Sequence, residues 1–162
     1  MRITLRALLV LVSLSYCSCQ KAPDLEKERA AVVKVLNDEG RLFAAGDLQS
    51  LASLHVRSDQ DARLAGTDLY EGWPAIEKLL AGYIAENKKN PNGITNPQNI
   101  KEHIVLKVNG NSAWLTCENI WRGEVKGVSQ ELEKNRQISF FEKIDGEWKF
   151  SFDAFVALPQ AN

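Results

Sequence analysis

The apolar residues of the chain first recur at helical spacing and later alternate as they do in strands. Over about residues 24–45 they return every three or four positions, with charged residues on the other face. Asp24 can cap this helix at its start, and Gly46 can take the left-handed position at its end. Asp47 can cap a second, shorter helix that begins at Leu48. The pattern predicts two helices joined at a Gly-Asp corner.

A third helix and a group of long strands follow. Residues 61–71 are predicted to be extended, and Pro74 suits the first turn of a helix, where its missing N–H is not needed. Residues 90–99 are rich in Pro, Asn and Gly and predict a loop. Beyond them apolar and polar residues alternate, and Asn109–Gly110 and Asp145–Gly146 predict two hairpin turns. This order predicts an α+β fold in which a strongly curved antiparallel sheet wraps three helices, as a cone with one open end.

Three segments carry a family resemblance. Phe43–His55 reads FAAGDLQSLASLH, Leu69–Ile76 reads LYEGWPAI, and Asp145–Phe150 reads DGEWKF. In this order and spacing they resemble the SnoaL-like family of the nuclear transport factor 2-like superfamily, over about residues 25–158. The resemblance implies a cone-shaped, cystatin-like roll, a fold that carries enzymes, binders and scaffolds alike.

The resemblance also implies where isomerase-type catalytic residues would lie. Ketosteroid isomerases of this superfamily place a carboxylate base opposite a site made of an acid and a tyrosine. The tyrosine position falls near Glu39, the base near Leu64 or Ala65, and the acid near Ser139 or Phe140. None of these positions holds the required residue type, so the known isomerase machinery is absent.

A His-x-His pair that related chains carry late in the last strand falls on Phe152 and Ala154, so it is missing as well. We therefore expect neither catalysis by the isomerase route nor a cofactor. The alternative is an isomerase, dehydratase or cyclase that works by acid-base chemistry with a relocated carboxylate. The candidates for that carboxylate are Glu102 and Asp153.

Strand alternation predicts which residues face the interior of the cone. With Asn109–Gly110 as the first turn, one face is aliphatic near the turn and polar or aromatic at its far end: Val108, Leu106, Ile104, Glu102, Ala113, Leu115, Cys117, Asn119 and Trp121. In the second hairpin we prefer a bulged Ile-Asp-Gly loop over a two-residue Asp-Gly turn, because the bulged loop buries more aromatic surface. That register gathers on one face Arg136, Ile138, Phe140, Trp148, Phe150, Phe152 and Ala154.

The far end of this face is the expected mouth of the cone. Apolar walls with a few convergent polar groups are typical of small-molecule sites. The predicted pocket consists of Trp73, Tyr83, Glu102, Asn119, Trp121, Arg136 and Phe152. Arg136 is expected either to pair with Glu102 or to make a salt bridge at the rim. The pocket is expected to bind a small, mostly apolar molecule.

The opposite face of the first hairpin carries apolar residues that a solvated surface does not need. Val105, Trp114 and Ile120 lie there in the predicted register. They predict a homodimer that forms through the back of the sheet. The protein would then be a small-molecule binder or a dimeric accessory module without catalysis.

Composition and charge exclude several other classes. The 162 residues include 20 Lys+Arg and 21 Asp+Glu, and this balance argues against a nucleic-acid-binding protein. Two His and three Cys are too few for a zinc finger or a disulfide scaffold. His55 and His103 are separated and lack clustered acidic partners, so no metal site is expected. Cys117 is expected to be a small buried residue, and Asp59 and Asp61 are expected in a solvated loop.

The start of the chain resembles an export signal. Two arginines and an apolar run over residues 5–14 open it, and the run is shorter than the roughly 20 residues of a membrane-spanning helix. A Cys that ends such a run after a small residue resembles a bacterial lipobox. Cys19 follows Ser18, whereas Cys17 follows the bulky Tyr16, so Cys19 is the better acylation site.

These features divide the chain into four parts: a signal peptide over residues 1–18, a lipidated Cys with a short tether over 19–24, a SnoaL-like domain over 25–158 and a tail over 159–162. Acylation of Cys19 would anchor the mature chain to a membrane by lipid. We expect an exported protein of the bacterial cell envelope, in the periplasm or at the cell surface, with plain secretion as the alternative.

Overall fold

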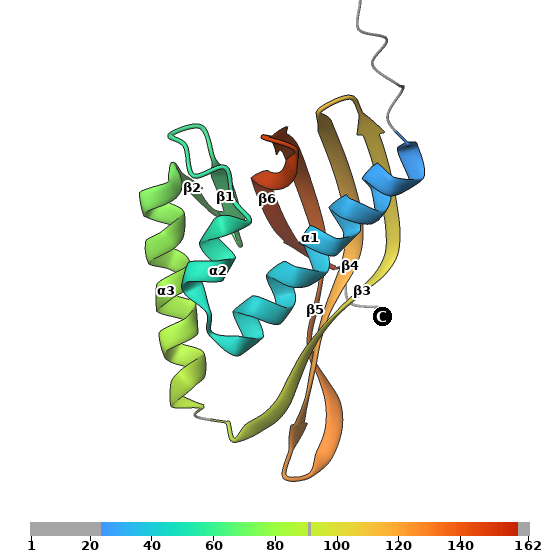
Figure 1. Cartoon of the computed structure of the whole chain (residues 1–162). Coiled ribbons are helices and arrows are strands. Elements are labelled where there is room, and N and C mark those ends of the chain that lie inside the picture. Colours follow the sequence, from blue (N-terminus) through green and yellow to red (C-terminus); the bar gives the residue numbers. More distant parts are fainter. Residues whose placement is uncertain (1–23, 91, 159–162) are drawn as a thin grey trace, which may run out of the picture.

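The computed structural model describes residues 24–90 and 92–158 and has the predicted α+β fold (Figure 1). Its helices are α1 (Leu25–Ala45), α2 (Leu48–Ser53) and α3 (Trp73–Lys89). Its strands are β1 (Ala62–Ala65), β2 (Asp68–Glu71), β3 (Ile94–Asn109), β4 (Ser112–Val125), β5 (Val128–Ile144) and β6 (Glu147–Ala157). The three predicted helices are confirmed. The loop expected over residues 90–99 is shorter, because β3 begins at Ile94 and pairs with the end of β4.

The six strands form one open, curved sheet in the order β2-β1-β6-β5-β4-β3. Neighbouring strands are antiparallel except β1 and β6, which run parallel, so the sheet is mixed and not wholly antiparallel. Helix α1 crosses one face of the sheet, and α3 lies beside the short strands β1 and β2 (Figure 1). We name the side that faces α1 the inner face and the opposite side the outer face. None of the described helices combines the length and the apolar character that crossing a bilayer requires.

The predicted caps hold the ends of α1 and the start of α2. The Asp24 side chain accepts hydrogen bonds from the backbone N–H groups of Glu26 and Lys27. Gly46 ends α1 with φ 68°, a left-handed conformation that glycine adopts without strain. One residue later, the Asp47 carboxylate accepts from the Ser50 N–H at 3.0 Å. The Gly-Asp corner therefore stops one helix and starts the next.

Two apolar cores flank the middle of the inner face. The first lies between α1 and strands β3–β6 and consists of Val32, Leu36, Leu106, Ala113, Leu115, Cys117, Phe141, Trp148 and Phe150. The second lies among the three helices and consists of Leu42, Leu51, Ile76, Leu80 and Ile84. Cys117 is buried as expected, and burial raises the pKa of its thiol to about 11. On α1, Glu39 lies between the residues of one core and those of the other.

The first hairpin turns one residue later than predicted. Asn109 pairs with Ser112, so Gly110 and Asn111 form the turn, and Gly110 has φ 60° as the first central residue of a type II′ turn does. Leu106 is therefore opposite Leu115. The shift changes the pairing by two residues, which leaves every side chain near the turn on its predicted face.

The second hairpin corrects the preferred register. Ile144 pairs with Glu147 across a two-residue turn, in which Asp145 and Gly146 both have positive φ, as in a type I′ turn. The bulge lies further along, where Phe141 pairs with Phe150 but Phe140 pairs with Phe152. The turn thus has its favoured geometry. The bulge lies between Phe150, which is in the core, and Phe152, which is on the outer face. The bulged Ile-Asp-Gly loop was therefore a wrong prediction.

Candidate functional site

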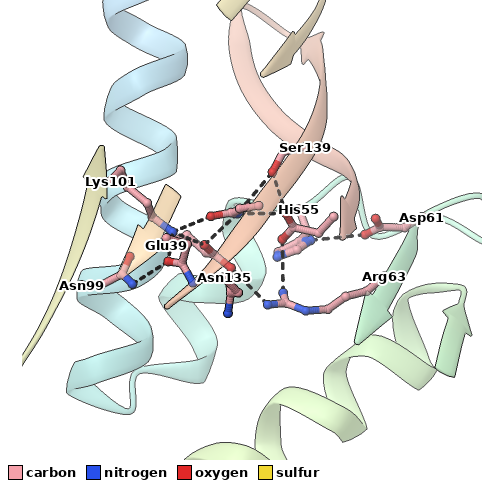
Figure 2. Close-up of polar contacts among 11 residues, drawn as sticks. Glu39, His55, Asp61, Arg63, Asn99, Lys101, Asn135 and Ser139 are labelled. Carbon is pink, nitrogen blue, oxygen red and sulfur yellow. Dashed lines mark hydrogen bonds and ion pairs between the residues drawn. The ribbon is translucent and has the colours of Figure 1, made fainter. Parts of the chain in front are cut away.

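Polar side chains gather in the middle of the inner face, where a core would be expected (Figure 2). We name this group the interior polar cluster: Glu39, His55, Asp61, Arg63, Asn99, Lys101, Asn119, Asn135, Gln137, Ser139 and Asp153. Nine of them are buried, and the Lys101 side chain is only 2 % exposed. Burying so many polar groups is costly unless they pair, so their arrangement is the main candidate for a functional site.

Strand alternation brings most of the cluster together. Asn135, Gln137 and Ser139 are buried in β5, and the residues between them lie on the outer face. Asn119 is the neighbouring member on β4, where it pairs with Asn135 across the strands. Lys101 reaches the same face from β3, where it pairs with Asn119. Three adjacent strands thus present a continuous polar strip to α1.

Two carboxylates and two cations form the charged centre. Arg63 lies between the carboxylates, with Nη2 3.3 Å from Glu39 Oε1 and Nη1 3.3 Å from Asp153 Oδ2. Lys101 Nζ lies 3.7 Å from the other oxygen of Glu39. These four side chains come from α1, β1, β3 and β6 and meet in the interior. Ion pairs this deeply buried gain from a low dielectric but lose the hydration of both charges.

Amide and hydroxyl groups surround the charged centre. Asp153 Oδ1 accepts hydrogen bonds from Ser139 Oγ at 2.6 Å and from Gln137 Nε2 at 3.0 Å. Lys101 Nζ donates to Asn119 Oδ1 at 2.8 Å and to Gln137 Oε1 at 2.5 Å. Gln137 therefore connects the lysine to the aspartate, and it fixes both side chains.

The environment moves the pKa values of the two carboxyl groups apart. Burial opposes ionisation of Glu39, but the charges of Lys101 and Arg63 outweigh it and hold its pKa below the ordinary value. Burial and the negative charge of Glu39 raise the pKa of Asp153, and Arg63, Ser139 and Gln137 offset this only in part. One carboxylate is thus strongly paired, while the other is placed to hold a proton. Such a division of roles is common where proteins bind or transform ligands.

A second buried pair lies beside the charged centre. His55 Nδ1 and Asp61 Oδ2 are 3.5 Å apart, and both side chains are 1 % exposed. The His55 ring packs between Trp73 and Phe150, with ring centroids 5.2 and 5.3 Å away. The expectation that Asp61 lies in a solvated loop is therefore wrong, because the chain between α2 and β1 runs through the interior.

Arg63 is incompletely paired for a buried guanidinium. Among the described residues, its Nε and Nη1 atoms make no hydrogen bond, and neither does Asp153 Oδ2. The contacts of Arg63 consist of one hydrogen bond to Glu39, the close approach of Asp153 and the Phe155 ring 4.7 Å from the guanidinium carbon. Since buried polar atoms are nearly always paired, this unused capacity points toward a partner other than the side chains already present.

The structure brings some of the predicted pocket residues to the interior. Asn119 and Asp153 belong to the interior polar cluster, and Trp121 follows Asn119 two positions further along the same face. Trp121 is partly buried against Phe43, with ring centroids 5.7 Å apart. Trp73 packs on the helical core and on His55.

Other predicted residues lie elsewhere. Tyr83 is 46 % exposed on α3. Glu102 is exposed and lies opposite Glu118 in the register of β3 and β4. A bulge between Glu102 and Val105 turns Lys101 inward in its place. Phe152 packs against Phe140 on the outer face, as the corrected second hairpin requires.

Arg136 also lies on the outer face. Its partner is Glu118, 3.4 Å away, and not Glu102. Glu118 also lies 2.6 Å from Lys134. Glu102, His103 and Glu118 have donor atoms within 4.8 Å of one another, as a metal site would require. However, Lys134 and Arg136 already neutralise Glu118, so this trio has little need of a cation.

Buried side chains of the interior polar cluster and of the first core lie between α1 and the sheet. Two hollows on the described surface, of about 310 and 150 Å³, lie outside the cluster. The larger is a groove between α1, the end of α2 and the start of β6, with Val35, Leu54 and Trp148 in its lining.

The residues that sequence reasoning missed are Arg63, Asn99, Lys101, Asn135 and Gln137. Polar residues at alternate positions of β5 were a usable signal, since they are expected either on a solvated face or in a site. Glu39 and Ser139 were considered only as positions where isomerase residues are lacking. Both nevertheless lie in the cluster.

Comparison with solved structures identifies the fold. A nuclear transport factor 2-like protein with a cystatin-like fold from Novosphingobium aromaticivorans superposes with a TM-score of 0.69 at 17 % identity, over 85 % of this chain and 86 % of that chain. A protein of the same organism proposed to be a scytalone dehydratase gives 0.67 at 14 %, over 85 % and 97 %. A proposed dehydratase of the nuclear transport factor 2-like family from Streptomyces avermitilis gives 0.68 at 14 %, over 83 % and 99 %.

These likenesses show that the chain has the nuclear transport factor 2-like, cystatin-like fold. No protein-family model and no curated protein matches the sequence. The fold alone does not assign an activity, because it carries several. The interior polar cluster is therefore the feature of this chain that bears on its function.

Proposed function

We propose that this nuclear transport factor 2-like chain binds a small organic molecule at the interior polar cluster. The observation that carries the proposal is Arg63, whose side chain is 8 % exposed and whose Nε and Nη1 atoms make no hydrogen bond among the described residues. A chain selected only for stability would gain by replacing such a group with an apolar one. A ligand that accepts hydrogen bonds in the interior would explain why it is kept.

The aromatic pair at the end of the inner face supplies the entrance. Along β4 the inner face runs from the buried Leu115 through Asn119 to the partly buried Trp121. Trp121 contacts Phe43 of α1, so moving these two rings would open a route from solvent to the cluster. The proposed ligand has a polar group that meets the cluster and an apolar body that lies against these rings. This keeps the expectation of a largely apolar ligand and adds a polar end.

The test uses the neutral apolar fluorophore N-phenyl-1-naphthylamine on the purified full chain. Trp121→Ala should weaken binding of the fluorophore about tenfold, because a large aromatic wall is lost. The matched control Trp114→Ala removes the same side chain from the outer face and should leave affinity unchanged. Leu106→Ala should instead lower the free energy of unfolding by about 2–5 kcal/mol, because Leu106 is a core residue. If Trp121→Ala destabilises as much as Leu106→Ala and leaves affinity untouched, Trp121 is a core residue and the proposal fails.

Acid-base catalysis is the second candidate, and Asp153 carries it. Of the two relocated carboxylates considered, Glu102 lies exposed on the outer face, whereas Asp153 is buried, hydrogen-bonded to Ser139 and raised in pKa. A buried acid of this kind can donate and accept a proton at a bound substrate. The two neighbours proposed to be dehydratases make the candidate worth testing.

Deuterium exchange can test this candidate before a substrate is known. Small molecules that co-purify with the full chain are incubated with it in D2O and followed by NMR. Catalysis predicts deuterium uptake at a carbon position with the wild type and none with Asp153→Asn. Equal uptake with both proteins would show that exchange does not depend on Asp153, and uptake with neither would leave binding without catalysis.

Self-association and membrane anchoring are further parts of the proposal. We propose a homodimer through an outer apolar patch, defined by Val105, Trp114, Phe140 and Val156, which are 56, 40, 47 and 44 % exposed. Ile120 does not belong to it, because it is 1 % exposed, which corrects the expectation for that residue. Cys19 lies outside the described residues, and lipidation there remains our proposal, as does location in the cell envelope.

A further inference from the structure

We infer that the ligand of the interior polar cluster carries a carboxylate, and that Arg63 binds this carboxylate in competition with Asp153. The inference rests on the proposed function and names the chemical class of its ligand. The guanidinium group of Arg63 has five N–H donors in a planar fork, which matches the two oxygens of a carboxylate. Only one hydrogen bond of that fork, 3.3 Å from Arg63 Nη2 to Glu39 Oε1, is formed among the described residues.

The charges around Arg63 favour an anion. Glu39 lies between Arg63 and Lys101, 3.3 and 3.7 Å from their nitrogens, and one carboxylate cannot neutralise two cations. The remaining positive charge is left to Asp153 or to a ligand. When Asp153 holds a proton, a ligand carboxylate together with Glu39 would balance the two cations.

Asp153 occupies the position that a ligand carboxylate would take, but its contact with Arg63 is poor. Its Oδ2 atom lies 3.3 Å from Arg63 Nη1 without forming a hydrogen bond, while Oδ1 accepts from Ser139 and Gln137. Asp153 is also near Glu39, a like charge in a buried place. The side chain is therefore held by its uncharged neighbours and can give up Arg63 to a better acceptor.

A neutral ligand would not balance the positive charge of Arg63 and would not bond to both sides of its guanidinium group. An amide or alcohol oxygen could accept one hydrogen bond from Arg63, but it would bring no charge and would fill only part of the fork. A phosphate would bring two charges, which exceeds the single positive charge in excess. A monocarboxylate on an apolar body fits the charge, the fork and the aromatic entrance together.

Benzoate and benzamide form a matched pair of probes for this inference, since they share size and ring and differ in charge. Binding to the full chain is measured by isothermal titration calorimetry. We expect benzoate to bind about 10- to 100-fold more tightly than benzamide, the range that a charged hydrogen-bond pair supplies. Arg63→Gln should remove this preference. The control Arg136→Gln, which removes an arginine paired with Glu118 on the outer face, should keep it.

Two further variants keep the test decisive if Arg63→Gln does not fold. Arg63→Lys retains the charge but not the fork, and should reduce the preference for benzoate without abolishing it. Asp153→Asn removes the internal competitor, and should tighten benzoate binding while leaving benzamide binding unchanged. Circular dichroism and thermal unfolding check that each variant is folded.

Any of three results would overturn the inference. Benzoate could bind no more tightly than benzamide, the preference for benzoate could survive in Arg63→Gln, or the substitution Asp153→Asn could weaken benzoate binding. Failure of the proposed function looks different, because the neutral fluorophore would then bind independently of Trp121. A neutral fluorophore that depends on Trp121, together with no preference for benzoate, would retain the site and reject its carboxylate ligand.

Discussion

Gly40 interrupts the middle of α1, where glycine costs about 1 kcal/mol relative to alanine. The structure gives the reason for it. A Cβ atom at Gly40 would overlap the side chain of Asn99, which donates a hydrogen bond to Asn119 at 2.7 Å. The missing side chain lets β3 approach α1 beside the interior polar cluster. Local helix propensity is therefore given up for a close contact at the candidate site.

Replacement of this residue gives the first prediction. Gly40→Ala should lower the free energy of unfolding by about 1–3 kcal/mol, because the overlap with Asn99 outweighs the gain in helix propensity. The control is Gly82→Ala in α3, where a Cβ meets nothing within 4 Å. That variant should be more stable than the wild type by about 0.5–1 kcal/mol. Urea unfolding of both proteins decides, and equal stabilisation by the two substitutions would show that Asn99 does not lie against Gly40.

At this scale the sequence predicted only part of the candidate site. Asn119 could be found by strand alternation, whereas Asp153 was named only as one of two carboxylates that could replace the missing isomerase residues. Arg63 could not, since a single arginine in a four-residue strand has no periodicity to show which way it points. Its role depends on Glu39 and Asp153, which are far from it in the sequence and meet it only through the sheet order.

A bulge in strand β3 determines which of its side chains reach the interior polar cluster. The alternation of Ile104, Leu106 and Val108 predicts the inner face correctly, but its extension to Glu102 fails. His103 has φ 51°, in the left-handed region, at the bulge between Glu102 and Val105. A bulge has no hydrophobic signature, because it changes the phase of the pattern and not its composition. The residue turned inward is therefore Lys101, and a cation replaces the expected acid.

The bulge gives the second prediction. His103→Gly should be more stable than His103→Val by about 1–3 kcal/mol, because a β-branched residue is strained at positive φ. At a regular strand position the order is reversed. Lys107 is exposed on the same strand and pairs with Trp114, so Lys107→Val should be more stable than Lys107→Gly. Thermal unfolding of the four variants measures both differences. The same order of Val and Gly at the two positions would mean that β3 is regular at His103.

The sequence predicts where the two hairpins turn, but not how their strands are paired. The Asn-Gly and Asp-Gly pairs correctly locate two hairpins, since few other sequences reverse a strand so tightly. They do not fix the register, because one dipeptide fits more than one turn. In the first hairpin the shift is even and leaves the faces unchanged. In the second hairpin a bulge beyond the turn moves Phe140 and Phe152 outward, and this altered the predicted pocket.

For the whole molecule, the outer apolar patch raises the question of what covers it. Its four members lie one on each of the adjacent strands β3, β4, β5 and β6, and Phe140 also contacts Phe152. Monomeric proteins rarely leave such groups of large apolar residues in water. A second copy that meets the patch through a two-fold axis would bury it, and a self-complementary surface is typical of dimers.

The third prediction follows from this surface. The full chain should sediment as a dimer at micromolar concentration, and Trp114→Glu or Phe140→Glu should shift it to monomer, because each buries a charge in the interface. Val128→Glu is the matched control, since Val128 is 64 % exposed but lies in the β4–β5 hairpin, outside the patch. It should leave the dimer intact. A monomeric wild type, or dimers of all three variants, would reject this interface.

The position of the proposed lipid would determine which end of the molecule lies near the membrane. Only five residues separate Cys19 from the first residue of α1, and even fully extended they reach about 20 Å. The start of α1 lies at the same end of the molecule as the β3–β4 turn, while the corner between α3 and β3 is at the opposite end (Figure 1). A lipid on Cys19 would therefore keep the first end near the bilayer.

The last prediction tests the lipid itself. Cells that express the full chain are labelled with a fatty-acid analogue, and the wild type should take up the label and fractionate with membranes. Cys19→Ser should lose the label, because the thioether forms on that sulfur. Cys17→Ser is the matched control and should keep the label, since the small Ser18 before Cys19 is unchanged. Labelling that depends on Cys17 and not on Cys19 would move the site by two residues. Unlabelled protein free in the medium would indicate a plain secretory signal.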